Sequence, residues 1–221
     1  MALFSQSDVL IQAEMWVKEQ FQHDRGGHDW WHVDRVRRLA VRLAKHYRAD
    51  LFICELAALL HDVADDKLIA DESSALAQLQ QWLYEHEVSE IIVQDVIEII
   101  TTMSFKGGNR APMRTIEGQI VQDADRLDAL GAIGIARTFA YSGWKGQHLY
   151  DPTIPPRLHM TSAQYRQEKS TAINHFHEKL LKLSETLNTQ AAREIAYERH
   201  QYMVKFVERF QLEWSGEDVE W

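Results

Sequence analysis

The sequence has little of several features that would narrow its class. It contains a single cysteine, Cys54, which excludes an intramolecular disulfide and which we expect to be a packed thiol in a core helix. No apolar run is long enough to cross a membrane, and the first residues lack the basic and then apolar order of an export signal. Repeats, low-complexity tracts and linker-like breaks are missing too. We therefore expect one cytoplasmic domain over residues 1–221 that makes no contact with a membrane.

Dense positive charge is also missing. The formal net charge is −9, and no run of Lys and Arg stands out. This argues against a dedicated nucleic-acid-binding protein, which would have to follow many phosphates. It does not exclude a small phosphorylated substrate, because a bound cation and a few local basic residues can reverse the field around a site.

Strand-like alternation does not interrupt the helical patterns, so the fold class we predict is all-α, a helical bundle. Hydrophobic residues make up 45% of the chain, enough for a substantial core. One long irregular segment, 142–160, holds three of the four prolines and precedes the C-terminal helices at 161–212. A helix is expected over 115–140, in which Gly131 and Gly134 permit close packing or a kink. The other helices are expected to begin at Ser5, near Trp30, at Asp50, at Ser73 or Ser74, and at Ser89, Thr161 and Thr189.

The stretch 55–66 organises the rest of the chain. Its leucines and valine repeat at helical spacing, which predicts a central helix, yet the helix ends in His61-Asp62-Val63-Ala64-Asp65-Asp66. Burying His61 and Asp62 costs several kcal/mol unless something neutralises them, and a divalent cation would do so. One helix cannot complete a coordination sphere, so further histidines or carboxylates are needed, and His32 and Asp125 are the candidates.

These residues resemble a known family. The order of His32, then His61-Asp62, then Asp125 within Ala-Asp-Arg-Leu is similar to that in HD-domain metal-dependent phosphohydrolases. The resemblance implies an HD-domain bundle with a metal-binding core at about 25–140 and C-terminal helices packed on it. It also implies that these four residues are the metal ligands. The run QDADRLDALGAIGIAR and a later INHFxEKLLKL pattern resemble a small subgroup of stand-alone bacterial HD hydrolases.

The resemblance implies a specific chemistry. The segment HDVADD looks like the HDxxED segment of HD enzymes that hydrolyse guanosine tetraphosphate, which places Asp65 and Asp66 as the catalytic acid and base. A metal-activated water would be the nucleophile. We expect one divalent metal, with Mn favoured and Mg, Fe, Ni, Co or Zn as alternatives. A second metal is not expected, because His86 is the one histidine between Asp62 and Asp125, and Met103 stands where some relatives carry His.

The expected substrates are (deoxy)nucleoside triphosphates, hydrolysed to monophosphate and pyrophosphate. Lys67, Arg35 and Arg126 are the candidates for binding substrate phosphates, although Lys67 fits a solvated loop charge equally well. Trp30 and Trp31 either shield the metal from water or pack in the core. Three alternatives stay open: a 5′-nucleotidase, a non-catalytic nucleotide-binding module, and oxygen chemistry at a two-iron site. The chain is expected to be a monomer or a homodimer.

Overall fold

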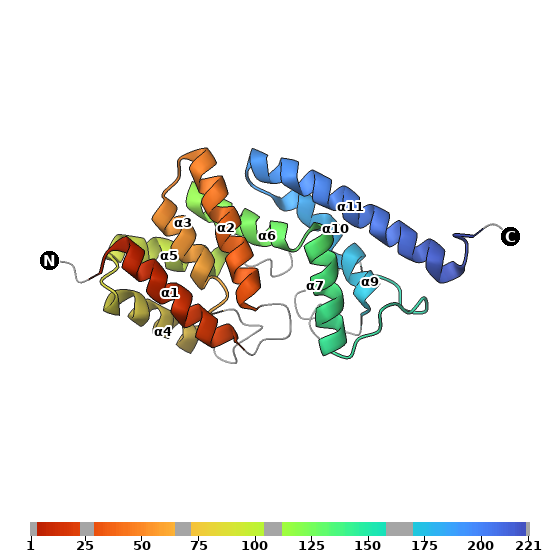
Figure 1. Ribbon diagram of the computed structural model, residues 1–221, viewed down its shortest axis with the longest axis horizontal. Coiled ribbons are helices and arrows are strands. Elements are labelled where there is room, and N and C mark those ends of the chain that lie inside the picture. Colours follow the sequence, from red (N-terminus) through yellow and green to blue (C-terminus); the bar gives the residue numbers. More distant parts are fainter. Residues whose placement is uncertain (1–3, 23–28, 65–71, 104–111, 158–169, 220–221) are drawn as a thin grey trace. The chain divides into compact units, whose positions relative to one another are not determined.

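The computed structural model describes residues 4–22, 29–64, 72–103, 112–157 and 170–219, and throughout these ranges the regular structure is helical (Figure 1). The all-α prediction is confirmed. The chain divides into two compact units, the first made of the described residues up to Asp125 and the second of those from Arg126 onward. The prediction of a single domain stays a prediction. In the described ranges, no helix combines the length and the apolarity needed to span a membrane.

The first unit is built around α3 (Leu51–Leu60), which contacts α1 (Gln6–Phe21), α2 (Trp30–Tyr47) and α5 (Glu90–Met103). Five consecutive residues of α3, Leu56 to Leu60, are fully buried. Burying a leucine side chain contributes about 1.5–3 kcal/mol, so α3 is the main apolar element of this unit. The other helices of the unit are α4 (Glu72–Glu85) and all but the last turn of α6 (Ile116–Asp128).

Several predicted helix starts are confirmed. Ser5 and Asp8 form a reciprocal capping box at the start of α1, and the Asp50 carboxylate accepts a hydrogen bond from the Ile53 N–H at the start of α3. Helix α4, in contrast, begins at Glu72, so Ser73 and Ser74 lie inside the helix and do not cap it. The predicted cap at Thr161 lies outside the described residues.

The second unit contains α7 (Gly131–Trp144), which contacts both α11 (Gln190–Ser215) and the short α9 (Ala172–His175). A π-helical turn (Phe176–Leu180), α10 (Leu181–Leu183) and a 3-10 turn (Ser184–Thr186) connect α9 to α11. The predicted N-cap of the last helix at Thr189 is confirmed. The irregular segment begins at Lys145 and not at Ser142, because α7 extends to Trp144.

The helix predicted over 115–140 is two helices, α6 and α7, and they meet near one of the two glycines that were expected to permit a kink. The helix breaks between Asp128 and Gly131, and Gly131 adopts a left-handed conformation with φ of 73°. A side chain is strained at that φ, and a Cβ at Gly131 would come within 3.0 Å of the Arg199 side chain. The left-handed conformation therefore favours glycine, and the side chain packed against Gly131 comes from 68 residues further along the chain, which helical periodicity does not reveal.

Candidate metal centre

The C-terminal end of α3 fixes the orientation of His61. Its Nδ1 lies 2.8 Å from the carbonyl oxygen of Ala58. Because a carbonyl oxygen only accepts, Nδ1 donates in this contact, and in the neutral ring Nε2 then has the lone pair. This is the arrangement in which a histidine binds a metal through Nε2.

The start of α2 fixes His32. Asp29 is the N-cap residue, and its carboxylate accepts a hydrogen bond of 2.9 Å from the His32 N–H. The His32 side chain is fully buried, and its Nε2 lies 3.2 Å from Nε2 of His61. Asp29 was missed as a functional residue by the sequence reasoning, although an aspartate three residues before His32 is a typical N-cap signal.

Asp62 completes a buried cluster with the two histidines. One carboxylate oxygen lies 3.3 Å from Nε2 of His32, and the other lies 3.3 Å from Nε2 of His61. The ligand atoms of the three residues all lie within 4.8 Å of one another, and all three residues are buried. Two imidazoles and a carboxylate that converge away from water form a group that could hold a metal ion, since buried charge requires a partner.

Asp125, from α6, lies at the open side of the cluster. Its Oδ1 is 3.6 Å from Nε2 of His32 and 3.9 Å from Nε2 of His61, and its side chain is 37% exposed. Helix α6 is held in place by a hydrogen bond from the Gln122 amide to the Met103 carbonyl at the end of α5. The four residues predicted to bind metal therefore lie together, and their donor set fits a divalent cation that prefers nitrogen and oxygen ligands.

Of the residues predicted to bind substrate or to act as acid and base, the structure describes Arg35 and Arg126. Arg35 lies on α2, about one turn after His32, and is half-buried. Arg126 directs its guanidinium group to the carbonyl oxygen of Thr186 in the second unit. Asp65, Asp66 and Lys67 lie outside the described residues.

The two tryptophans beside His32 and the remaining histidine between Asp62 and Asp125 differ in exposure and in their contacts. Trp31 is 62% exposed, which is inconsistent with core packing. Trp30 is half-buried, and the Lys18 ammonium lies over its ring. His86 stacks on Trp82, and its Nδ1 donates to the Trp82 carbonyl.

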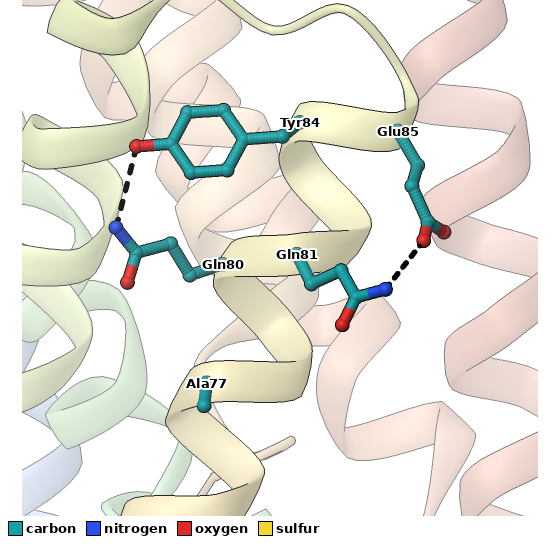
Figure 2. A pocket seen from close by; sticks show the side chains of 5 residues that line it. All are labelled: Ala77, Gln80, Gln81, Tyr84 and Glu85. Atoms are coloured by element: carbon teal, nitrogen blue, oxygen red, sulfur yellow. Dashed lines mark hydrogen bonds between the residues drawn. The ribbon is translucent and has the colours of Figure 1, made fainter.

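A hollow of about 520 Å³ lies elsewhere, on the surface of α4 (Figure 2). Its lining residues are Ala77, Gln80, Gln81, Tyr84 and Glu85, all from one helix. As Figure 2 shows, the Gln80 amide donates to the Tyr84 hydroxyl and the Gln81 amide donates to Glu85. These groups bond along the helix and do not converge on a ligand, so this hollow does not compete with the histidine cluster as a site.

Comparison with known proteins agrees with the geometry. The family model of the HD domain matches residues 30–130, a range that contains all four predicted ligands. The protein YpgQ of Bacillus subtilis, itself described as uncharacterized, is 39% identical over 211 residues, which cover 95% of each chain. A crystal structure of YpgQ in complex with ADP has a TM-score of 0.74 and 38% identity, covering 92% of this chain and 97% of that one.

Two further solved structures cover nearly all of the chain. A protein from Lactobacillus plantarum has a TM-score of 0.86 and 43% identity, covering 98% of this chain and 100% of that one. An HD-superfamily hydrolase from Bacillus thuringiensis has a TM-score of 0.74 and 44% identity, covering 96% and 99%. The chain therefore belongs to the HD-domain family, among the small stand-alone bacterial proteins that include YpgQ and the Bacillus thuringiensis hydrolase.

Proposed function

We propose that the chain is a metal-dependent phosphohydrolase that converts (deoxy)nucleoside triphosphates to monophosphate and pyrophosphate. The observation that carries the proposal is the buried convergence of His32, His61 and Asp62, with Asp125 at its open side. The ADP complex of YpgQ supports a nucleotide as the ligand.

We propose that His32, His61, Asp62 and Asp125 hold one divalent cation, with Mn favoured over Mg, Fe, Ni, Co and Zn. When bound, such a cation polarises a phosphoryl group and lowers the pKa of a coordinated water, which supplies a nucleophile near neutral pH. The protein contributes the preorganisation. The Ala58 carbonyl selects the tautomer of His61, and Asp29 fixes the helix turn that carries His32, so little ordering is left to be done when the ligand arrives.

The positions of the remaining polar residues suggest their roles. Asp125 is the most exposed of the four ligand candidates, so substrate would enter on its side. We propose that Asp65 and Asp66, which come three and four residues after Asp62 in the sequence, accept the proton of the attacking water or protonate the leaving oxygen. Arg35, one turn along α2 from His32, is proposed to bind substrate phosphate, with Lys67 and Arg126 as further candidates.

The test is to incubate the purified protein, with Mn and separately with Mg, with ribo- and deoxynucleoside tri-, di- and monophosphates, and to resolve the products by chromatography. Monophosphate plus pyrophosphate is the expected result. Asp62→Asn should abolish turnover, whereas Asp151→Asn, a surface change in the second unit, should leave it intact. Orthophosphate from monophosphates alone would replace the proposal with a 5′-nucleotidase.

A second readout separates binding from catalysis. Metal present at about 100 times its Kd should stabilise the folded protein by about 2.7 kcal/mol, which appears as a raised Tm. Asp62→Asn should lose this stabilisation. Metal binding without turnover of any nucleotide would favour a non-catalytic nucleotide-binding module. A ratio well above one metal per chain would revive the two-iron alternative.

A further inference from the structure

Helix α2 carries an unusual excess of positive charge. Its 18 residues include five Lys or Arg and one acidic residue, in a chain whose net charge is −9. The long helix α11 is the useful comparison, because its four basic residues are balanced by four acidic ones. Solvated helix faces usually carry charges of both signs, so the excess of positive charge on α2 favours the binding of an anionic ligand.

Most of this charge lies along one line. Successive residues of an α-helix are rotated by about 100°, so the α2 stripe, defined here as Trp31, Arg35, Arg38, Arg42 and Lys45, lies within about 40° of a single line along the helix. The opposite side of α2 is apolar and buried, and consists of Val33, Val36, Ala40, Leu43 and Ala44. The fifth basic residue, Arg37, lies off the stripe, and its charge is matched by Glu14 and Asp34.

The side chains of the stripe face water. Arg42 and Lys45 are exposed, and Arg35 is half-buried. The Arg38 side chain is 62% exposed and is paired with Asp34 at 3.0 Å. An ion pair with so much exposure is weak, so Arg38 can exchange this partner for a phosphate at little cost.

The stripe begins beside the metal centre and runs away from it. With a rise of 1.5 Å per residue, Arg35 lies about 4.5 Å along the axis from His32, Arg42 about 15 Å and Lys45 about 20 Å. Trp31 stands at the other end, next to His32, and its indole is 62% exposed. The order along α2 is therefore one exposed aromatic ring, the buried ligand candidate, and then four cations.

We propose that the α2 stripe binds nucleoside oligophosphates, meaning one base that carries a linear chain of more than three phosphates. The base would stack on Trp31, the first phosphate would lie at the metal centre, and the remaining phosphates would follow Arg35, Arg38, Arg42 and Lys45. A triphosphate covers less than half of this length, so Arg42 and Lys45 serve longer chains. Hydrolysis consumes one water, breaks the bond between the first phosphorus and its bridging oxygen, and releases monophosphate, the linear oligophosphate and a proton. The inference rests on the proposed function and extends its substrate class.

Single-stranded nucleic acid fits the stripe less well. Proteins that bind single strands supply an aromatic side chain for successive bases along the basic groove. The stripe has one aromatic residue and then four cations with no ring between them. That composition matches one base and many phosphates.

The test is equilibrium binding by calorimetry in chelator-containing buffer, without metal and therefore without turnover. The probes are adenosine tri-, tetra- and pentaphosphate, inorganic polyphosphate, and a single-stranded oligothymidylate of charge equal to the pentaphosphate. The affinity for adenosine phosphates should rise with chain length. Arg42→Gln and Lys45→Gln should each weaken pentaphosphate binding by roughly two- to fivefold and should reduce the dependence on length.

Two variants make the test specific. Arg48→Asn removes the same charge from the end of α2, off the stripe and at a left-handed position that asparagine tolerates, and it should leave binding unchanged. Trp31→Ala should weaken binding of the adenosine pentaphosphate by about fivefold or more and leave inorganic polyphosphate unaffected. Because Trp31 is exposed, neither this change nor the others should unfold the helix.

Three results would overturn the inference: equal affinity for triphosphate and pentaphosphate, an equal loss in Arg48→Asn, or tighter binding of the oligothymidylate than of the pentaphosphate. Failure of the proposed function would appear in a different assay, as the lack of nucleotide hydrolysis with Mn or Mg. Length-dependent binding without hydrolysis would thus support the binding role of the α2 stripe and contradict the proposed enzymatic function. Hydrolysis of triphosphates without length-dependent binding would support the enzymatic function and contradict the role of the stripe.

Discussion

A buried ion pair in the second unit makes a sharp prediction about stability. Glu178 lies in the π-helical turn, and its side chain is 1% exposed. Its carboxylate accepts three hydrogen bonds from Arg157, from the backbone N–H at 3.0 Å, from Nε at 2.9 Å and from Nη2 at 2.8 Å, and one from the Ser170 hydroxyl at 3.0 Å. The perturbation is Glu178→Ala, which leaves the Arg157 guanidinium, 16% exposed, without its carboxylate.

The size of the effect follows from burial. Removing one partner of a buried ion pair costs about 3–5 kcal/mol, because the other charge stays desolvated. Arg157 retains some contact with water, so we expect about 3 kcal/mol, a large part of the 5–15 kcal/mol that is typical of a whole domain. Adding up the four hydrogen bonds separately would overshoot, since each replaces a bond to water.

The protonation state of Glu178 supports this estimate. Burial by itself would raise the pKa of this carboxyl, but hydrogen bonds from Arg157 and Ser170 and the charge of Arg157 outweigh it, so the pKa is lowered. Because the folded pKa lies below the unfolded one, the stabilisation is complete at neutral pH. It is lost as the pH falls below the unfolded value of about 4.3 and through the folded one.

The assay is urea unfolding at pH 7, with the free energy extrapolated to water. The matched control is Glu213→Ala, which breaks a pair with Arg209 of 2.6 Å. The side chains of that pair are 56% and 59% exposed, so the loss should be much smaller than that of Glu178→Ala. The double variant Glu178→Leu with Arg157→Met should recover most of the loss, because no buried charge is left unpaired. A Glu178→Ala loss no larger than that of Glu213→Ala would refute the reasoning that burial makes this pair strong.

Three further predictions concern single residues. Gly134→Ala should destabilise the protein by more than about 2 kcal/mol, because the new Cβ would lie 2.2 Å from the Ala129 carbonyl oxygen. Gly143→Ala on the same helix meets nothing within 4 Å and should stabilise the protein by about 0.5–1 kcal/mol, and the urea midpoints of the two variants test both expectations. Burial, with the charge of Lys179, lowers the pKa of His175 to about 3 in the folded protein. Protonation of this histidine in the unfolded chain should therefore lower the free energy of unfolding by about 1–2 kcal/mol between pH 6.5 and pH 5. In His175→Gln, the difference between the unfolding midpoints at pH 7 and pH 5 should be correspondingly smaller. Burial, with the charges of Glu117 and Asp50, raises the pKa of Cys54 to about 12. Alkylation by iodoacetamide at pH 8 should therefore be about a thousandfold slower in the folded protein than in urea, and equal rates would show that this thiol is not buried.

Local signals predicted the helix starts that depend on neighbouring residues. The capping box of Ser5 with Asp8 and the N-cap at Asp50 each involve a side chain and a backbone N–H three residues away, so the sequence contains the whole interaction. The predicted central helix is confirmed for the same reason, because the spacing of its leucines reports burial directly.

Features that depend on distant residues could not be predicted in this way. The glycines marked a possible kink, but the contact of Gly131 with the Arg199 side chain and the ion pair of Glu178 with Arg157 each join residues more than 20 positions apart. His32 and His61 lie 29 residues apart, and no periodicity brings their Nε2 atoms together. Their pairing was anticipated from the resemblance to a family. The distances of Asp125 and the exposure of Trp31 came from the structure alone.

The candidate metal centre and the core of the first unit depend on each other energetically. His32, His61 and Asp62 are 0%, 5% and 4% exposed, and burying such groups costs free energy unless they are paired. Helix α3 offsets this cost, since Leu56, Leu59 and Leu60, which lie within five residues before His61, are fully buried. A core that supplies enough stability by itself can hold the ligand atoms together before a cation arrives. The cation then binds more tightly than it would at an unfolded site, because none of its binding free energy is spent on folding the protein. The first unit should consequently stay helical when metal is removed by a chelator and lose only part of its Tm, in contrast to small zinc domains that unfold without their ion.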